Sequence, residues 1–136
     1  MFGTYQHSEL RIELKVSAER IGQSLTEPSH LKQWLWPQRV IFLDGNGEQS
    51  FSSTTATKLA IGQVFESYVG LANVEHKVEQ LTPFAVRFLL SGSIDGFHEW
   101  QWGEGWVQSR LEGVSLLPLN LGQTSGLLRL KRYLQP

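Results

Sequence analysis

The chain of 136 residues carries 12 basic and 13 acidic side chains, 40% hydrophobic residues and no cysteine. This near-neutral balance argues against nucleic-acid binding, which relies on many Lys and Arg side chains. The missing cysteines exclude disulfides, thiolate metal ligands and a thiol nucleophile. The length suits a single domain, 1–136, and with neither a secretory signal nor an apolar run of about 20 residues we expect a cytoplasmic protein without a membrane span.

The N-terminal part of the chain predicts one strand and two short helices. Residues 9–16 alternate between charged and apolar side chains, which is the pattern of a strand with one buried face. Ser17 is placed to cap a first helix. Pro28 suits the first position of a second helix, because its missing N–H would be unpaired there. This second helix, residues 28–35, carries Trp34 on its apolar face.

Beyond residue 37 the sequence changes to a period of two and predicts six further strands. They are expected at residues 39–43, 64–70, 74–81, 84–90, 97–102 and 107–116. The stretches DGNG, PF, SGSIDG and GEG are the expected breaks, and the long polar run of residues 48–63 has no clear element. Consecutive short strands favour an antiparallel sheet, and residues 119–134, which return to a helical period, predict the helix that covers its apolar face.

Alternation within the strands predicts which side chains face the space between sheet and helix. Charged residues mark the outer faces, so the inward residues are Val74, His76, Val78, Val86, Phe88, Leu90, His98, Trp100 and Trp102. Trp106 shares its phase with polar residues and is expected at the rim or outside. The inward indoles either fill an ordinary core or line a hollow.

With these elements placed, the segment VSAERIGQSLTEPSHLKQWLWP at residues 16–37 resembles the corresponding segment of the START-like (SRPBCC) superfamily. This superfamily includes the Bet v 1-like proteins, the polyketide cyclase/dehydrase group and the Aha1-type domains. The positions that carry the resemblance are Leu25, Thr26, Glu27, Pro28, Leu31 and Trp34. Gly62 followed by Phe65, and the sequence LLRLKRYL near the C-terminus, are similar to the family's third strand and closing helix.

The resemblance implies an α+β helix-grip fold. In that fold a seven-stranded antiparallel sheet curls around a long C-terminal helix, two short helices follow the first strand, and a cavity lies between sheet and helix. Two departures bear on the cavity: GEGW replaces the Gly-Thr that often opens the last strand, and Gly122 and Gly126 interrupt the closing helix. These glycines leave volume opposite the sheet, unless the helix approaches the sheet closely or begins only after Gly126.

The inward histidines, His76 and His98, also have two interpretations. A buried imidazole needs a hydrogen-bond partner, which is either a protein group or the polar end of a ligand, and the second arrangement would also allow proton transfer. Their strands are separated by one other, so their backbones should lie roughly 10 Å apart and a shared metal is not expected. No metalloprotease, serine-hydrolase or phosphate-loop motif is present, and we predict no metal and no cofactor.

Three functions stay open at this point. The first is binding of a small hydrophobic or aromatic molecule, a lipid included, by Trp34, Phe65, His76, Phe88, His98, Trp100, Trp102, Leu127 and Leu130. The second, implied by the family, is a cyclase- or hydrolase-like enzyme in which a cavity histidine acts as general acid or base, with the catalytic residues unassigned. The third is an Aha1-like module that binds a protein partner through an exposed apolar patch.

Overall fold

A computed structural model describes residues 3–35, 39–43, 58–69 and 71–136, and it confirms the predicted helix-grip fold. The seven strands form one antiparallel sheet in the order β1-β7-β6-β5-β4-β3-β2. In chain order the elements are β1 (Thr4–Glu13), α1 (Ala18–Thr26), α2 (Pro28–Trp34), β2 (Arg39–Leu43), β3 (Val64–Val69), β4 (Ala72–Thr82), β5 (Ala85–Gly92), β6 (Ile94–Gly103), β7 (Trp106–Ser115) and α3 (Leu119–Leu134). None of the described helices is both long enough and apolar enough to cross a membrane.

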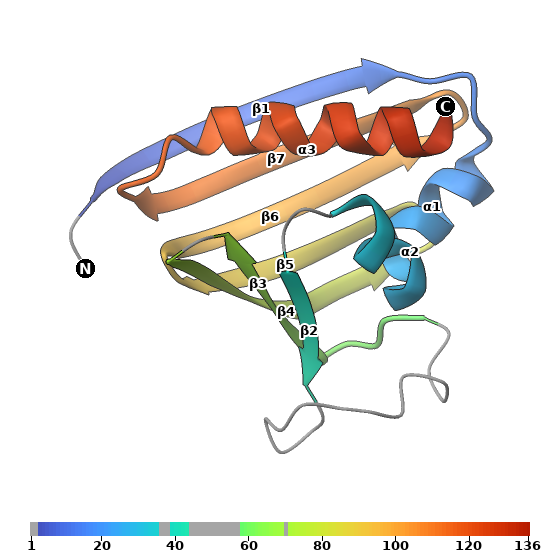
Figure 1. Ribbon diagram of the computed structural model, residues 1–136. Coiled ribbons are helices and arrows are strands. Elements are labelled where there is room, and N and C mark those ends of the chain that lie inside the picture. The colour runs from blue at the N-terminus through green and yellow to red at the C-terminus, as the bar shows by residue number, and fades with distance from the viewer. Residues whose placement is uncertain (1–2, 36–38, 44–57, 70) are drawn as a thin grey trace.

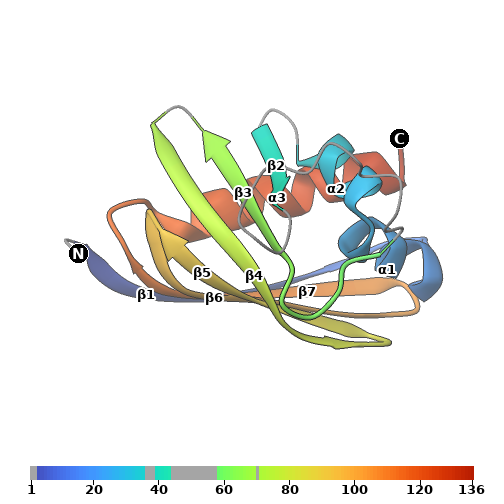
Figure 2. The same cartoon turned by 90° about the horizontal axis from the view of Figure 1, so that it is seen from below.

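The sheet curves around α3 (Figures 1 and 2). In Figure 2, β1, β7, β6 and β5 run beneath the helix, whereas β4 and β3 rise along its side. The short helices α1 and α2 lie together near the C-terminal end of α3 in both views. The N-terminal half of α3 is therefore bordered mainly by the sheet, and its C-terminal half also by α1 and α2.

The first strand begins and ends earlier than predicted. It spans Thr4–Glu13 and pairs along its whole length with β7. Leu14 and Val16 keep their predicted buried side, but their backbones bond to the β6–β7 turn instead of a strand: the Leu14 amide donates to the Gly105 carbonyl at 2.9 Å, and the Gly105 amide to the Val16 carbonyl at 3.1 Å. The strand stops at residue 13 because β7 begins at the residue opposite and offers no further partner.

The two short helices begin as predicted. Ser17 caps α1, because its Oγ accepts a hydrogen bond from the Arg20 amide at 3.3 Å, and Pro28 is the first residue of α2. α2 ends one residue earlier than predicted. The Trp34 indole Nε1 donates to the Ser24 carbonyl at 2.7 Å and so fixes the end of α2 against α1.

The predicted break at SGSIDG, residues 91–96, is confirmed in position but is shorter than predicted, because the β5–β6 pairing ends at Leu90 and Gly96 while both strands extend into this stretch. β5 continues to Gly92 and β6 begins at Ile94, so that a single residue separates the strands. This tight connection is possible because Gly92 has a φ of +92°, which side chains rarely allow, and because the amide of Ser93 is satisfied by the Asn73 carbonyl at 2.7 Å. The breaks at residues 83–84 and 104–105 are turns as predicted, whereas DGNG lies outside the described residues.

The closing helix has the predicted bounds, residues 119–134. Residues spaced three or four apart form one buried face of α3, which packs against the sheet and the short helices. The buried residues are Leu119, Gln123, Gly126, Leu127, Leu130 and Leu134. The helix thus begins before both of its glycines, and Gly122 and Gly126 lie inside it.

Candidate ligand-binding cavity

A cavity of about 450 Å³ lies between the inner face of the sheet and α3. Its wall is mostly apolar, and the polar groups in it are few. The lining residues are Trp34, Leu35, Ser67, Ala72, Val74, His76, Leu90, Ile94, His98, Trp100, Leu111, Leu117, Pro118, Leu119, Leu121, Gly122, Gln123, Ser125, Gly126 and Arg129. They come from the α2 segment, five of the strands, the connection into α3 and α3 itself, so residues far apart in the sequence build one hollow.

The two helix glycines face this open space. A Cβ added at Gly122 or Gly126 would meet no other atom within 4 Å, even though Gly126 is buried. A close approach of helix to sheet is therefore not the reason for either glycine, and neither is a helix that begins after residue 126. Instead, each glycine leaves room that a side chain would otherwise occupy.

The tryptophans of HEWQWGEGW, residues 98–106, have three different surroundings. Trp100 lines the cavity and meets Trp34 edge to face, with ring centroids 5.9 Å apart. Trp102 points inward as predicted and is buried, but it packs against Gly22 of α1, away from the cavity. Trp106 lies on the outer side as expected, where the Arg11 guanidinium sits 4.2 Å above its ring.

His76 faces the cavity from β4 and is held by its neighbours. Its Nε2 pairs with Ser67 Oγ at 3.0 Å. Its ring stacks on Phe65, with centroids 4.5 Å apart and planes 6° from parallel, and meets Phe88 edge to face. Burial lowers the pKa of His76 to about 3, so the imidazole is neutral at pH 7.

His98 lies on β6 with a similar arrangement. Its Nε2 pairs with Ser109 Oγ at 2.6 Å, and its ring lies over Trp100 with centroids 4.6 Å apart. Burial, together with the nearby His76, lowers the pKa of His98 to about 3. Both histidines thus have a protein partner on Nε2, and among the described residues neither ring makes a hydrogen bond through Nδ1.

Gln123 completes the polar group around His98, and the sequence analysis missed it. Its Nε2 donates to the Ser109 carbonyl at 2.8 Å, to Ser109 Oγ at 3.0 Å and to the Ser8 carbonyl at 3.2 Å. The amide cannot be turned over, because Oε1 would then face two carbonyl oxygens. Ser109 Oγ, which accepts from Gln123, thus joins the glutamine amide and His98 Nε2 in one hydrogen-bonded group.

The predicted binding residues divide into two groups. Trp34, His76, His98 and Trp100 line the cavity. The remaining ones are buried without lining it: Phe65, Phe88, Trp102, Leu127 and Leu130. Phe65 and Phe88 act on the wall indirectly, because they hold the ring of His76.

Two further wall residues carry chemistry that the sequence did not reveal. Gln123 lacks any pattern that would distinguish it from a surface glutamine of an amphipathic helix. Arg129 lies near the C-terminal end of the helix, where a cation suits the helix dipole, yet its side chain lines the cavity. The described residues contain no group of three or more His, Cys, Asp or Glu side chains placed to hold a metal ion.

The geometry can be compared with known proteins at the level of the fold. No protein-family model and no curated protein matches the sequence. Protein CV1439 from Chromobacterium violaceum has a similar structure, with a TM-score of 0.68, 16% identity and coverage of 96% of this chain and 97% of that one. The Aha1 dimer from Colwellia psychrerythraea gives a TM-score of 0.65 at 21% identity, over 96% of each chain. The chain has the START-like, or Bet v 1-like, fold.

A third structure shares this fold. DynU16, a protein of the dynemicin biosynthetic locus, matches 95% of the chain with a TM-score of 0.64 and 15% identity, but the chain covers only 47% of DynU16. Identities this low establish the shared fold alone. The function has to be argued from the cavity itself.

Proposed function

We propose that the protein binds a small apolar or aromatic molecule in the cavity between the sheet and α3. The observation that carries this proposal is the open space beside Gly126, a buried residue in the middle of the closing helix. Protein interiors are normally packed as densely as organic crystals, so empty space beside a buried glycine needs an explanation. The cavity that includes this space has a volume of about 450 Å³. Its volume falls within the range of known small-molecule sites, about 300–1,000 Å³.

The wall suits a ligand that is largely apolar. Trp34 and Trp100 offer aromatic surface, and aliphatic side chains such as Val74 and Leu90 supply most of the rest. The two histidines present unbonded Nδ1 atoms, which would orient a polar group of the ligand. Such a combination, apolar area for affinity and a few fixed polar atoms for orientation, is typical of carrier and sensor proteins.

Acid–base catalysis is less well supported by the same residues. The lowered pKa values of about 3 make His76 and His98 weak bases, whereas an effective general base has a pKa near the working pH. Ser109, the hydroxyl beside His98, is completely buried and so is not accessible as a nucleophile. We therefore favour binding over turnover.

A protein-interaction role is the second candidate. Leu116 and Leu121 are 77% and 64% exposed beside the start of α3, and such apolar exposure can mark a partner surface. The similar structure of an Aha1 protein as a dimer is in keeping with this reading. A partner surface, however, does not account for the hollow behind it.

The first test is native mass spectrometry of the purified protein, followed by extraction and identification of any bound molecule. We expect an apolar adduct with a stoichiometry near one. The Gly126→Leu variant should lose the adduct, because its side chain would project into the cavity. Thr124→Leu is the matched control, since it adds a leucine to an exposed position of the same helix.

The proposal also predicts binding to added hydrophobic probes, with a response of tryptophan fluorescence because two indoles line the wall. Affinity should fall by at least about tenfold in Gly126→Leu and stay unchanged in Thr124→Leu. A protein that carries no adduct and does not bind apolar probes would contradict the binding function and would favour the protein-interaction role. If Gly126→Leu and Thr124→Leu bind the probes equally well, the ligand does not occupy the cavity beside α3.

A further inference from the structure

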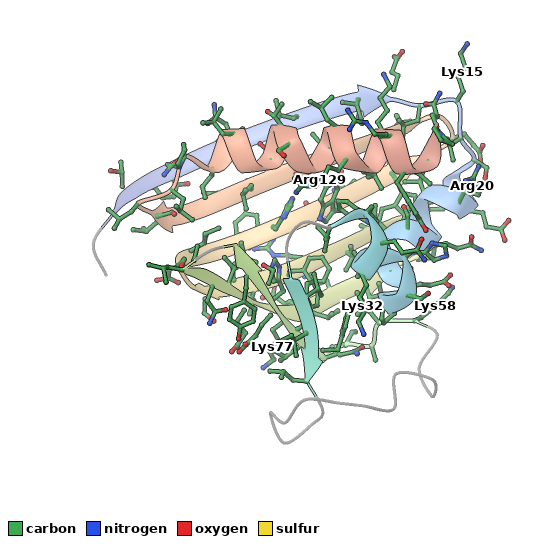
Figure 3. All side chains as sticks on the ribbon, viewed as in Figure 1. Lys15, Arg20, Lys32, Lys58, Lys77 and Arg129 are labelled. Atoms are coloured by element: carbon green, nitrogen blue, oxygen red, sulfur yellow. The ribbon has the colours of Figure 1, made fainter. Side chains whose placement is uncertain are left out.

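Arg129 occupies an unusual position for a charged residue of the closing helix. In Figure 3 it lies beneath α3, on the side of α2 and β2, whereas the labelled Lys15 and Arg20 lie at the far end of the molecule. Its side chain contributes to the cavity wall. On the next turn, Lys131 and Arg132 are exposed and do not reach the cavity.

The guanidinium of Arg129 has no acidic counterpart in the described part of the chain. Its Nη1 donates to Ser125 Oγ at 2.7 Å, one helical turn away, and its Nε is buried without a hydrogen-bond partner among the residues that the structure describes. None of the described residues that line the cavity is Asp or Glu. The described ion pairs of other arginines, such as Arg87 with Glu79 and Glu99, lie elsewhere.

An unpaired cation beside an apolar hollow is costly for the protein alone. Burial lowers the pKa of Arg129, which means that its charged form is partly deprived of water. Buried charges are ordinarily paired, because desolvation without a partner is unfavourable. An anion delivered by the ligand would supply the missing partner.

We propose that Arg129 binds a carboxylate, so that the ligand is an amphipathic monoacid with its apolar body in the cavity and its charged end at this guanidinium. This inference rests on the proposed binding function. The described residues of the wall offer one positive charge, because both histidines are neutral at pH 7. A single charge matches a carboxylate better than a phosphate monoester of charge about −1.5 to −2. The Ser125 hydroxyl accepts from Arg129 and keeps its own proton to donate to the second carboxylate oxygen.

The test compares ligands that differ only in charge. Calorimetric titrations would use 2-naphthoate against 2-naphthamide and decanoate against decanol, with the delipidated wild-type protein at pH 7. We expect one of the two carboxylates to bind about tenfold more tightly than its neutral counterpart, a difference of about 1.4 kcal/mol. Arg129→Gln should bring this ratio close to one without weakening the neutral member, and Arg129→Lys should retain part of the preference.

Arg132→Gln is the matched control, because it removes one positive charge from the same helix at an exposed position outside the cavity wall. It should leave the ratio unchanged. If the neutral compounds bind as well as the acids, or if Arg129→Gln and Arg132→Gln behave alike, the carboxylate assignment is overturned while the apolar site stands. If neither member of either pair binds, both the assignment and the proposed binding function are wrong.

Discussion

Gln123 fixes the closing helix against the sheet through a single amide group. Its Nε2 reaches two strand carbonyls and one hydroxyl, from Ser8 and Ser109, and thereby links α3 to β1 and β7. Its Oε1 is buried and has no partner in the described residues, which costs roughly 1–3 kcal/mol for such a group. The same side chain therefore stabilises the position of the helix and carries an unsatisfied acceptor in the wall of the cavity.

Replacing Gln123 with Ala should destabilise the protein by about 1 kcal/mol, because the strand carbonyls lose their donor and the helix loses a contact, and this outweighs the removal of the unpaired Oε1. Urea unfolding at pH 7, followed by circular dichroism, measures this change. Gln108→Ala is the control: this glutamine accepts from Arg11 on the outer face, and its loss should change stability by no more than about 0.5 kcal/mol. Equal effects of the two substitutions would mean that the Gln123 bonds contribute little.

At the scale of the element, α3 combines a packing face with a face that lines the cavity. Leu127, Leu130 and Leu134 pack in the core, while Gly122, Ser125, Gly126 and Arg129 follow one another along the cavity side. Each glycine in a helix interior costs about 1 kcal/mol relative to Ala. The glycines therefore lower the stability of the helix on the side that lines the cavity, where a ligand would need room. Functional sites commonly reduce protein stability in this way.

Gly126→Ala should therefore raise the free energy of unfolding by about 0.5–1 kcal/mol, because the new methyl group meets no atom within 4 Å. Gly96→Ala should do the opposite and disrupt the sheet, because its Cβ would collide with the Glu112 carbonyl oxygen of the neighbouring strand. Thermal and urea unfolding of both variants would measure the contrast. A destabilised Gly126→Ala protein would show that the space beside the helix is not open.

At the scale of the whole molecule, local patterns predicted the fold but only part of the site. The inward faces of β4, β5 and β6 followed from alternation, since the direction of a side chain in a strand is a local property. Whether an inward residue meets the void or other side chains is decided by elements distant in the sequence. Phe65 faces inward and yet packs between Phe42 and His76, so it supports the wall without reaching the hollow.

The charged and amide residues of the wall escaped prediction for a related physical reason. Arg129 near the end of a helix is well explained by the dipole, and only the curvature of the sheet places its side chain at a cavity. Gln123 lies among the leucines of an amphipathic helix, and the sequence does not show whether this single polar side chain faces the sheet or the solvent. For His76 and His98 the alternation predicted that the side chains point inward. It did not predict that each imidazole pairs with a serine hydroxyl.

The two histidines should make the stability of the whole molecule depend on pH. In the unfolded chain a histidine takes up a proton near pH 6.5, whereas the folded pKa of each is about 3. Between these values the unfolded state binds more protons, so the free energy of unfolding falls as the pH falls, by up to about 1.4 kcal/mol per pH unit for each histidine. The contribution is fully present above pH 6.5 and declines toward pH 3.

Urea unfolding at pH 7.0, 6.0 and 5.5 tests this expectation in a range where most carboxylates stay ionised. From pH 7.0 to 5.5 the wild-type protein should lose about 2–3 kcal/mol if both histidines contribute, and His76→Gln or His98→Gln should lose about half as much. His7→Gln, which changes an exposed histidine of β1, should follow the wild-type curve. A wild-type stability that is flat over this range would mean that the folded protein takes up as many protons as the unfolded chain, so that the imidazoles are protonated in the folded cavity as readily as in water.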